Sequence, residues 1–158
     1  MKKNDRFIDI EYLTIGDTIQ KINQYKMYLD SGIVNPNASR FYSIDLPDTI
    51  QLNKEYKFNI FLNDHAMGEE DIYLSFLTLS DDIDVNFENF WKVKNTYFIE
   101  DVSRNKWKAK KIFRTKGLNT VKGYIYVQDE EHKNIDEKYI DIEDYSRIFY
   151  IYKEIFVK

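Results

Sequence analysis

Apolar and polar residues alternate along most of this chain, and the alternation predicts β-strands. In residues 55–63 every second position is a large apolar residue, which is typical of a strand with one buried face. Residues 71–79 are apolar on both faces, which is typical of a central strand. The same criteria predict further strands over residues 82–88, 107–115, 118–128 and 146–157. Turn residues separate these strands at the spacing of an antiparallel sandwich.

The first part of the chain has a less regular pattern. We expect residues 1–45 to form an N-terminal segment that packs on, or leads into, a main domain of residues 46–158. Apolar residues just before Gly16 predict a strand. Residues 17–30 allow two structures, because either a turn at Gly16-Asp17 makes a hairpin, or Asp17 or Thr18 caps a short helix with apolar residues at helical spacing. The sequence leaves both structures open.

The composition also favours strands. The chain has 158 residues, of which 43% are apolar and 16% aromatic, and isoleucine outnumbers leucine 20 to 9. β-branched and aromatic side chains fit a pleated, half-buried surface better than a helix. The length suits one domain with its own core. We therefore predict an all-β fold, an antiparallel sandwich of roughly seven or eight strands with an N-terminal extension.

The residues present give little support to the common types of chemistry. The chain has no cysteine, which excludes disulfides and thiolate metal sites. Its two histidines, His65 and His132, lie in polar contexts without a partner motif for catalysis. Residues 82–86 match the opening of a calcium loop, but Phe87 stands where that loop needs glycine. We predict no catalytic, cofactor-binding or metal-binding residues, and we expect that the chain is not an enzyme.

One stretch resembles a known structural family. Residues 117–129 (GLNTVKGYIYVQD) combine a glycine-containing turn with a strand rich in Thr, Tyr and Val that ends at an acidic residue. This stretch resembles the penultimate strand of bacterial immunoglobulin-like domains, and residues 147–157 resemble the last strand. The resemblance implies an immunoglobulin-like sandwich over about residues 55–158. The chain departs from antibody domains, because it lacks their Cys…Trp…Cys core.

The start of the chain carries a second resemblance. Lys2, Lys3, Asn4 and Asp5 are similar to the residues that follow the lipidated cysteine in lipoproteins of the Bacteroidota, and the Ile-, Lys- and Asn-rich composition agrees with that phylum. The resemblance implies a periplasmic or outer-membrane-associated protein, held at the membrane only by a lipid anchor at the position of Met1. A native Met1 implies a cytoplasmic protein instead.

Charge is distributed unevenly, although the net charge is only −4. Residues 104–123 carry eight basic residues and no acid, whereas residues 129–144 carry eight acids and two lysines. The negative net charge argues against a nucleic-acid partner. Two interpretations remain. The two segments neutralise each other across the sheet, or one of them forms a charged face for a protein partner.

Aromatic residues cluster in the least regular part of the main domain, at Phe87, Phe90, Trp91, Tyr97 and Phe98. Such residues either anchor a protein interface or cover one end of the core as a lid. The candidate contacts to a protein partner are Phe90, Trp91, Tyr97, Trp107, Lys108 and Lys110.

These observations lead to one functional prediction and one alternative. The prediction is a non-catalytic binding or structural module of a bacterial cell envelope, resembling a lipoprotein. The alternative is a small acidic immunity- or inhibitor-type protein that blocks a protein partner. An enzyme is the third hypothesis.

Overall fold

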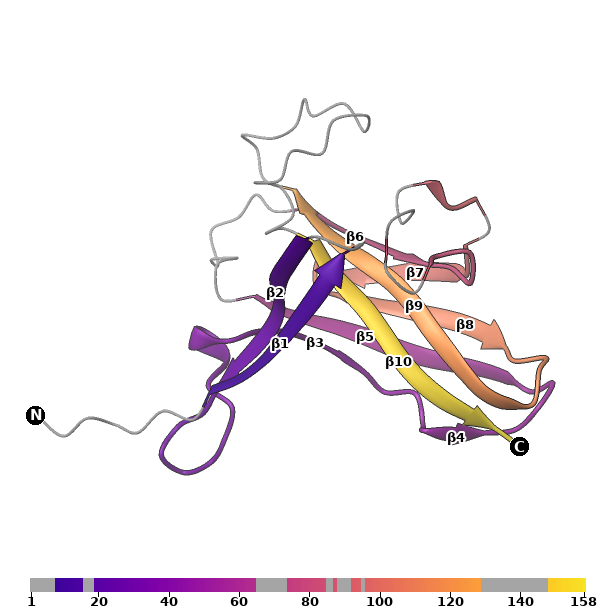
Figure 1. Ribbon diagram of the computed structural model, residues 1–158, viewed down its shortest axis with the longest axis horizontal. Coiled ribbons are helices and arrows are strands. Elements are labelled where there is room, and N and C mark those ends of the chain that lie inside the picture. The colour runs from indigo at the N-terminus through magenta and orange to yellow at the C-terminus, as the bar shows by residue number, and fades with distance from the viewer. Residues whose placement is uncertain are drawn as a thin grey trace, which may run out of the picture.

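The computed structural model describes residues 8–15, 19–64, 74–84, 87, 92–94, 96–128 and 148–158. Over these residues the fold is all-β, apart from one short 3₁₀ helix at Pro36–Ala38. Figure 1 shows the strands arranged in two sheets that pack against each other. The predicted all-β sandwich is therefore confirmed.

One sheet has six strands and the other has four. The six-stranded sheet contains, in spatial order, β1 (Ile8–Ile15), β2 (Ile19–Met27), β3 (Arg40–Ile44), β5 (Glu55–Asp64), β8 (Lys106–Ile112) and β7 (Phe98–Ser103). The four-stranded sheet contains β4 (Thr49–Ile50), β10 (Ile148–Val157), β9 (Gly117–Gln128) and β6 (Leu74–Leu79). Neighbouring strands are antiparallel, except that β4 runs parallel to β10.

Alternation along the strands places the core between the two sheets. In β5 the side chains of Phe58, Ile60 and Leu62 are buried, while Glu55 and Lys57 point to solvent. The four-stranded sheet contributes a matching set of buried residues: Val121, Ile125, Val127, Phe149, Ile151, Ile155 and Val157. These side chains form one continuous apolar cluster with those of β5 and β8.

Residues 19–27 form a strand, so the hairpin rather than the helix is the correct structure for this region. β2 pairs antiparallel with β1 along its length, and Tyr25 of β2 pairs with Arg40 of β3. The first two strands therefore extend the same sheet that contains β5. The domain boundary expected at residue 45 stays a prediction.

The β1–β2 hairpin reaches across to the four-stranded sheet, and Figure 1 shows it crossing in front of β10. Leu13 of β1 packs against a second buried cluster, which is made of Ile83, Phe87, Ile148 and Tyr150. The rings of Phe87 and Tyr150 meet edge to face, with centroids 4.9 Å apart. This second cluster covers part of the outer face of the four-stranded sheet, so apolar residues are buried on both sides of β10 there.

Two sequence-based strand assignments are corrected. β6 was expected to be central, but within the described residues it pairs with β9 alone, and Phe76 is half exposed. Residues 82–88 were expected to form a strand, yet their described members lie in a turn. Ile83 and Phe87 are buried as the alternation predicts, but Phe87 has a φ of 57°, which no extended strand allows. The alternation therefore predicted the burial of Ile83 and Phe87 correctly, but the strand conformation that it predicted is wrong.

Candidate functional site

The outward face of β5, β7 and β8 carries most of the exposed lysines of the basic segment. We name this surface the lysine face. Its members are Lys57, Phe61, Phe98, Glu100, Lys106, Lys108 and Lys110. The alternation of β8 places its lysines here, because Trp107 and Ala109 between them point into the core.

One row of the lysine face joins two cations and an exposed aromatic ring. Lys110 lies directly opposite Lys57 on β5 and opposite Phe98 on β7. The Lys110 ammonium lies 5.1 Å from the centroid of the Phe98 ring, and 62% of Phe98 is exposed. Like charges directly opposite each other on neighbouring strands are destabilising. An anionic group placed over Lys57 and Lys110 would remove that repulsion.

In the neighbouring row of the lysine face, the lysine lies opposite an acidic residue. Lys108 lies opposite Glu100 on β7 and opposite Asn59 on β5. The Asn59 side chain donates to Asp45, with a nitrogen–oxygen distance of 2.6 Å, and the Asn59 backbone N–H donates to the same carboxylate at 2.5 Å. The unbalanced positive charge of the lysine face therefore centres on Lys57 and Lys110 rather than on Lys108.

A cleft lies at the end of β8, beside the first residues of β9. Lys111 points to the core side of β8, and its ammonium forms an ion pair with Asp81 at 2.6 Å. The Tyr97 hydroxyl donates to the same carboxylate. Burial and the negative charge of Asp81 raise the pKa of Tyr97 well above its ordinary value, so the hydroxyl stays protonated as a donor. Lys111 also lies 4.1 Å from the centroid of the Tyr97 ring.

The cleft has a volume of about 520 Å³. Its cationic lining residues are Lys111, Arg114 and Lys122, and its one carboxylate is Asp81. The Lys122 ammonium donates to the backbone carbonyl of Ile83, which fixes the side chain without neutralising its charge. The lining therefore carries two positive charges more than negative ones.

A third polar cluster fastens the hairpin to β10. The Lys21 ammonium donates to the carbonyl of Ile148 at 2.6 Å and lies 5.1 Å from the centroid of the Tyr150 ring. Burial, with a smaller effect from the positive charge of Arg40, lowers the pKa of Lys21 to about 7. This cluster is half buried and holds the two sheets together, so we assign it a structural role.

The residues proposed from the sequence fall in different places. Lys108 and Lys110 lie on the lysine face, and Tyr97 lies at the cleft with its ring partly buried. Trp107 was wrongly taken as a partner contact, because its side chain is 0% exposed in the core. Phe90 and Trp91 lie outside the described residues.

Lys57 was not among the residues proposed from the sequence, whereas Phe98 belonged to the predicted aromatic cluster, and together they complete the most cationic row of the lysine face. The alternation of β5 already placed Lys57 outward, but no sequence signal paired it with Lys110. Among the described residues, no group of three or more His, Cys, Asp or Glu side chains is arranged to hold a metal ion. Both histidines, and the acidic segment 129–144 expected to neutralise the basic one, lie outside that part of the chain. No helix in the described part is long and apolar enough to cross a membrane.

Comparisons with known proteins find similarity among solved structures. No family model matches the chain, and no curated protein matches it. Among solved structures, the chain is similar to a superoxide reductase (neelaredoxin) from Ignicoccus hospitalis, with 12% sequence identity and a TM-score of 0.38. The similarity covers 77% of this chain and 83% of that chain.

The expectation that the chain is not an enzyme is corrected by this comparison, because the similar structure carries the name of an enzyme. The exclusion of enzymes is therefore withdrawn. At this TM-score and identity the similarity transfers no reaction, substrate or site to the chain.

Proposed function

We propose that this chain is an immunoglobulin-like module that binds a protein partner through the lysine face. The strand order supports the first part of the proposal. β3, β5, β8 and β7 follow one another as strands A, B, E and D do in an immunoglobulin constant-type sheet, and β6, β9 and β10 follow the order C, F and G. The β1–β2 hairpin is an addition at the free side of the first of these strands.

The row formed by Lys57, Lys110 and Phe98 carries the second part. Two like charges are held opposite each other beside an exposed ring, on a rigid sheet rather than on a loop. Exposed aromatic residues supply large contact area at small entropic cost, and cations around them select partners of opposite charge. The partner that fits is a protein surface with a central apolar contact and carboxylates around it.

A pair of charge-reversal variants tests this function. The first variant reverses Lys57, Lys108 and Lys110 to Glu on the lysine face. The matched control reverses Lys54, Lys94 and Lys158, which are exposed lysines off that face, so both proteins have the same net charge. Each protein is immobilised and exposed to extract from the native host. We expect a partner that wild type and control retain and the first variant loses. Equal retention by all three proteins would contradict the proposed site.

Location in a bacterial cell envelope is a separate part of the proposal, supported by the residues that follow Met1. Mass spectrometry of the protein from its native host tests it directly. An acylated cysteine in the position of Met1 supports an envelope module. An unmodified Met1 contradicts this location and favours the alternative, an inhibitor-type protein.

A further inference from the structure

β9 is longer than the strand that pairs with it on one side. β9 covers twelve residues, from Gly117 to Gln128, but its register with β6 ends at Gly123. The backbone N–H of Ser80 donates to the carbonyl of Lys122 at 3.0 Å, and the chain then turns away at Asp81. Residues 117–121 therefore have an open edge on this side, within the part of the chain that the structure describes.

The backbone groups of this edge point into the cleft. In an antiparallel strand, successive residues direct their N–H and C=O groups to opposite sides. Lys122 directs its carbonyl toward β6, so Thr120 and Leu118 face the same way, beyond the end of β6. Among the described residues, no hydrogen bond outside the strand ladders uses the backbone of Thr120 or Leu118. An exposed row of this kind is a template for another strand.

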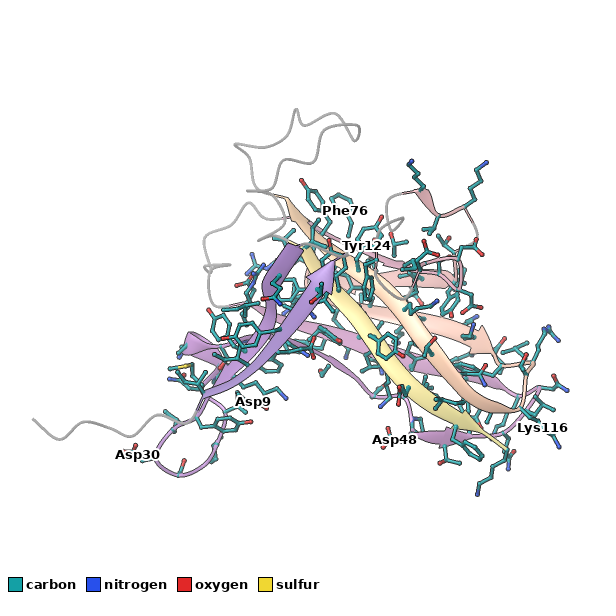
Figure 2. The ribbon with its side chains drawn as sticks, in the orientation of Figure 1. Asp9, Asp30, Asp48, Phe76, Lys116 and Tyr124 are labelled. Atoms are coloured by element: carbon teal, nitrogen blue, oxygen red, sulfur yellow. The ribbon has the colours of Figure 1, made fainter. Side chains whose placement is uncertain are left out.

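The side chains around this edge define the charge of an incoming strand. Lys111 is neutralised by Asp81, whereas Arg114 and Lys122 also line the cleft and form no ion pair with a described carboxylate. Lys116 lies at the same end of the sandwich, as Figure 2 shows, while Phe76 and Tyr124 lie toward the other end of the sheet. Leu118, which is 68% exposed, adds an apolar contact beside the cations.

We propose that the open edge of β9 at residues 117–121 binds an extended acidic segment of a partner protein, which adds to the sheet as a short strand. Backbone hydrogen bonds to Leu118 and Thr120 fix the segment, as in other cases of strand addition. Carboxylates at its alternate positions meet Arg114 and Lys122. This site lies in the four-stranded sheet and does not depend on the lysine face.

Three synthetic hexapeptides test the proposal. One alternates valine and glutamate, the second alternates valine and lysine, and the third is the glutamate peptide with a central proline, which removes one backbone donor. Binding is followed by NMR through the amide signals of residues 114–122 and through hydrogen exchange at Thr120. We expect saturable shifts and slower Thr120 exchange with the glutamate peptide. The lysine and proline peptides should bind at least tenfold more weakly.

Variants separate this edge from the lysine face. Arg114→Glu, at an exposed position, should weaken the glutamate peptide about tenfold, whereas Lys110→Glu should leave its affinity unchanged. An equal loss with Lys110→Glu would place the binding on the lysine face and overturn the proposal. Equal affinity for all three peptides would also overturn it, as would the absence of saturable shifts. Slower Thr120 exchange that depends on protein concentration without peptide would assign the edge to a second copy of this chain.

Discussion

Asn23 pairs its side-chain amide with the backbone of Tyr150, 127 residues away along the chain. The amide nitrogen donates to the Tyr150 carbonyl at 2.7 Å, and the amide oxygen accepts from the Tyr150 N–H at 2.8 Å. The register of β1 and β2 skips Asn23, which forms a bulge between Gln24 and Ile22. Bulges redirect side chains, and here the bulge directs an amide at the edge of β10. One side chain thus supplies the hydrogen bonds of a missing strand.

Removing this amide should cost the protein substantial stability. Asn23→Ala removes both hydrogen bonds from the Asn23 amide to the buried backbone of Tyr150, and each such loss costs about 1–3 kcal/mol. We expect a loss of about 3 kcal/mol in the free energy of unfolding, measured by urea denaturation. Gln20→Ala is the control, because Gln20 is an exposed residue of the same strand, and it should cost less than about 1 kcal/mol. An unchanged exchange rate of the Tyr150 amide in Asn23→Ala would contradict the assignment.

Lys21 should make the stability of the fold depend on pH. Its pKa is lowered from 10.5 to about 7 in the folded state, so the unfolded chain binds more protons between these values. The cost of burying the charge is fully present below pH 7, and stability rises as the pH increases from about 7 toward 10.5.

Lys21→Met removes this dependence and isolates it from other titrating groups. Urea denaturation at pH 6 and pH 9 should show a larger rise in stability for wild type than for the variant. Lys153→Met, which removes an exposed ion pair with Asp48, is the control and should change with pH as wild type does. Parallel behaviour of wild type and Lys21→Met would show that Lys21 is not buried as described.

Two glycines should respond differently to alanine. A Cβ at Gly123 would collide with the backbone carbonyl of Thr78 and with Leu79, in the middle of paired strands. Gly117 has a φ of +92° but open space around it. We expect Gly123→Ala to cost about 3 kcal/mol through overpacking. Gly117→Ala should cost about 1–2 kcal/mol through backbone strain alone. Thermal denaturation of both variants measures the difference, and the reverse order would contradict the pairing of β6 with β9.

Trp107 should tolerate phenylalanine far better than alanine. Its side chain is fully buried, and its indole N–H has no hydrogen-bond partner among the described residues. Trp107→Phe removes that unpaired donor and keeps most of the apolar contact, so the loss should stay below about 1.5 kcal/mol. Trp107→Ala should cost about 4 kcal/mol. Urea denaturation followed by far-ultraviolet circular dichroism checks both values, and similar losses for the two variants would contradict a packed site.

The sequence predicted those parts of the fold that depend on alternation within one strand. The buried face of β5, the long β9 and the closing β10 all follow from such patterns. The alternation also predicted that Trp107 is buried, because the lysines on either side of it in sequence point to the opposite face of the strand. Trp107 was interpreted as a contact residue because of its residue type, and its position in the alternation was given less weight.

The parts that were missed depend on contacts between distant segments. Ile83 and Phe87 alternate like a strand, yet they are buried because the turn that holds them packs on Ile148 and Tyr150. The pairing of Lys57 with Lys110 requires the register of two strands in which these residues lie 53 positions apart in sequence. The cleft exists because the first residues of β9 extend beyond the last residue of β6. No pattern within a single segment of the sequence predicts these contacts between distant segments.

Acetylation footprinting of the lysines tests the proposed function most directly. The protein is labelled alone and while bound to its partner in host extract, and each lysine is quantified by mass spectrometry. We expect binding to protect Lys57, Lys108 and Lys110 several-fold and to leave the labelling of Lys54, Lys94 and Lys158 unchanged. Equal protection of the two sets of lysines, or protection of the second set alone, would contradict recognition through the lysine face.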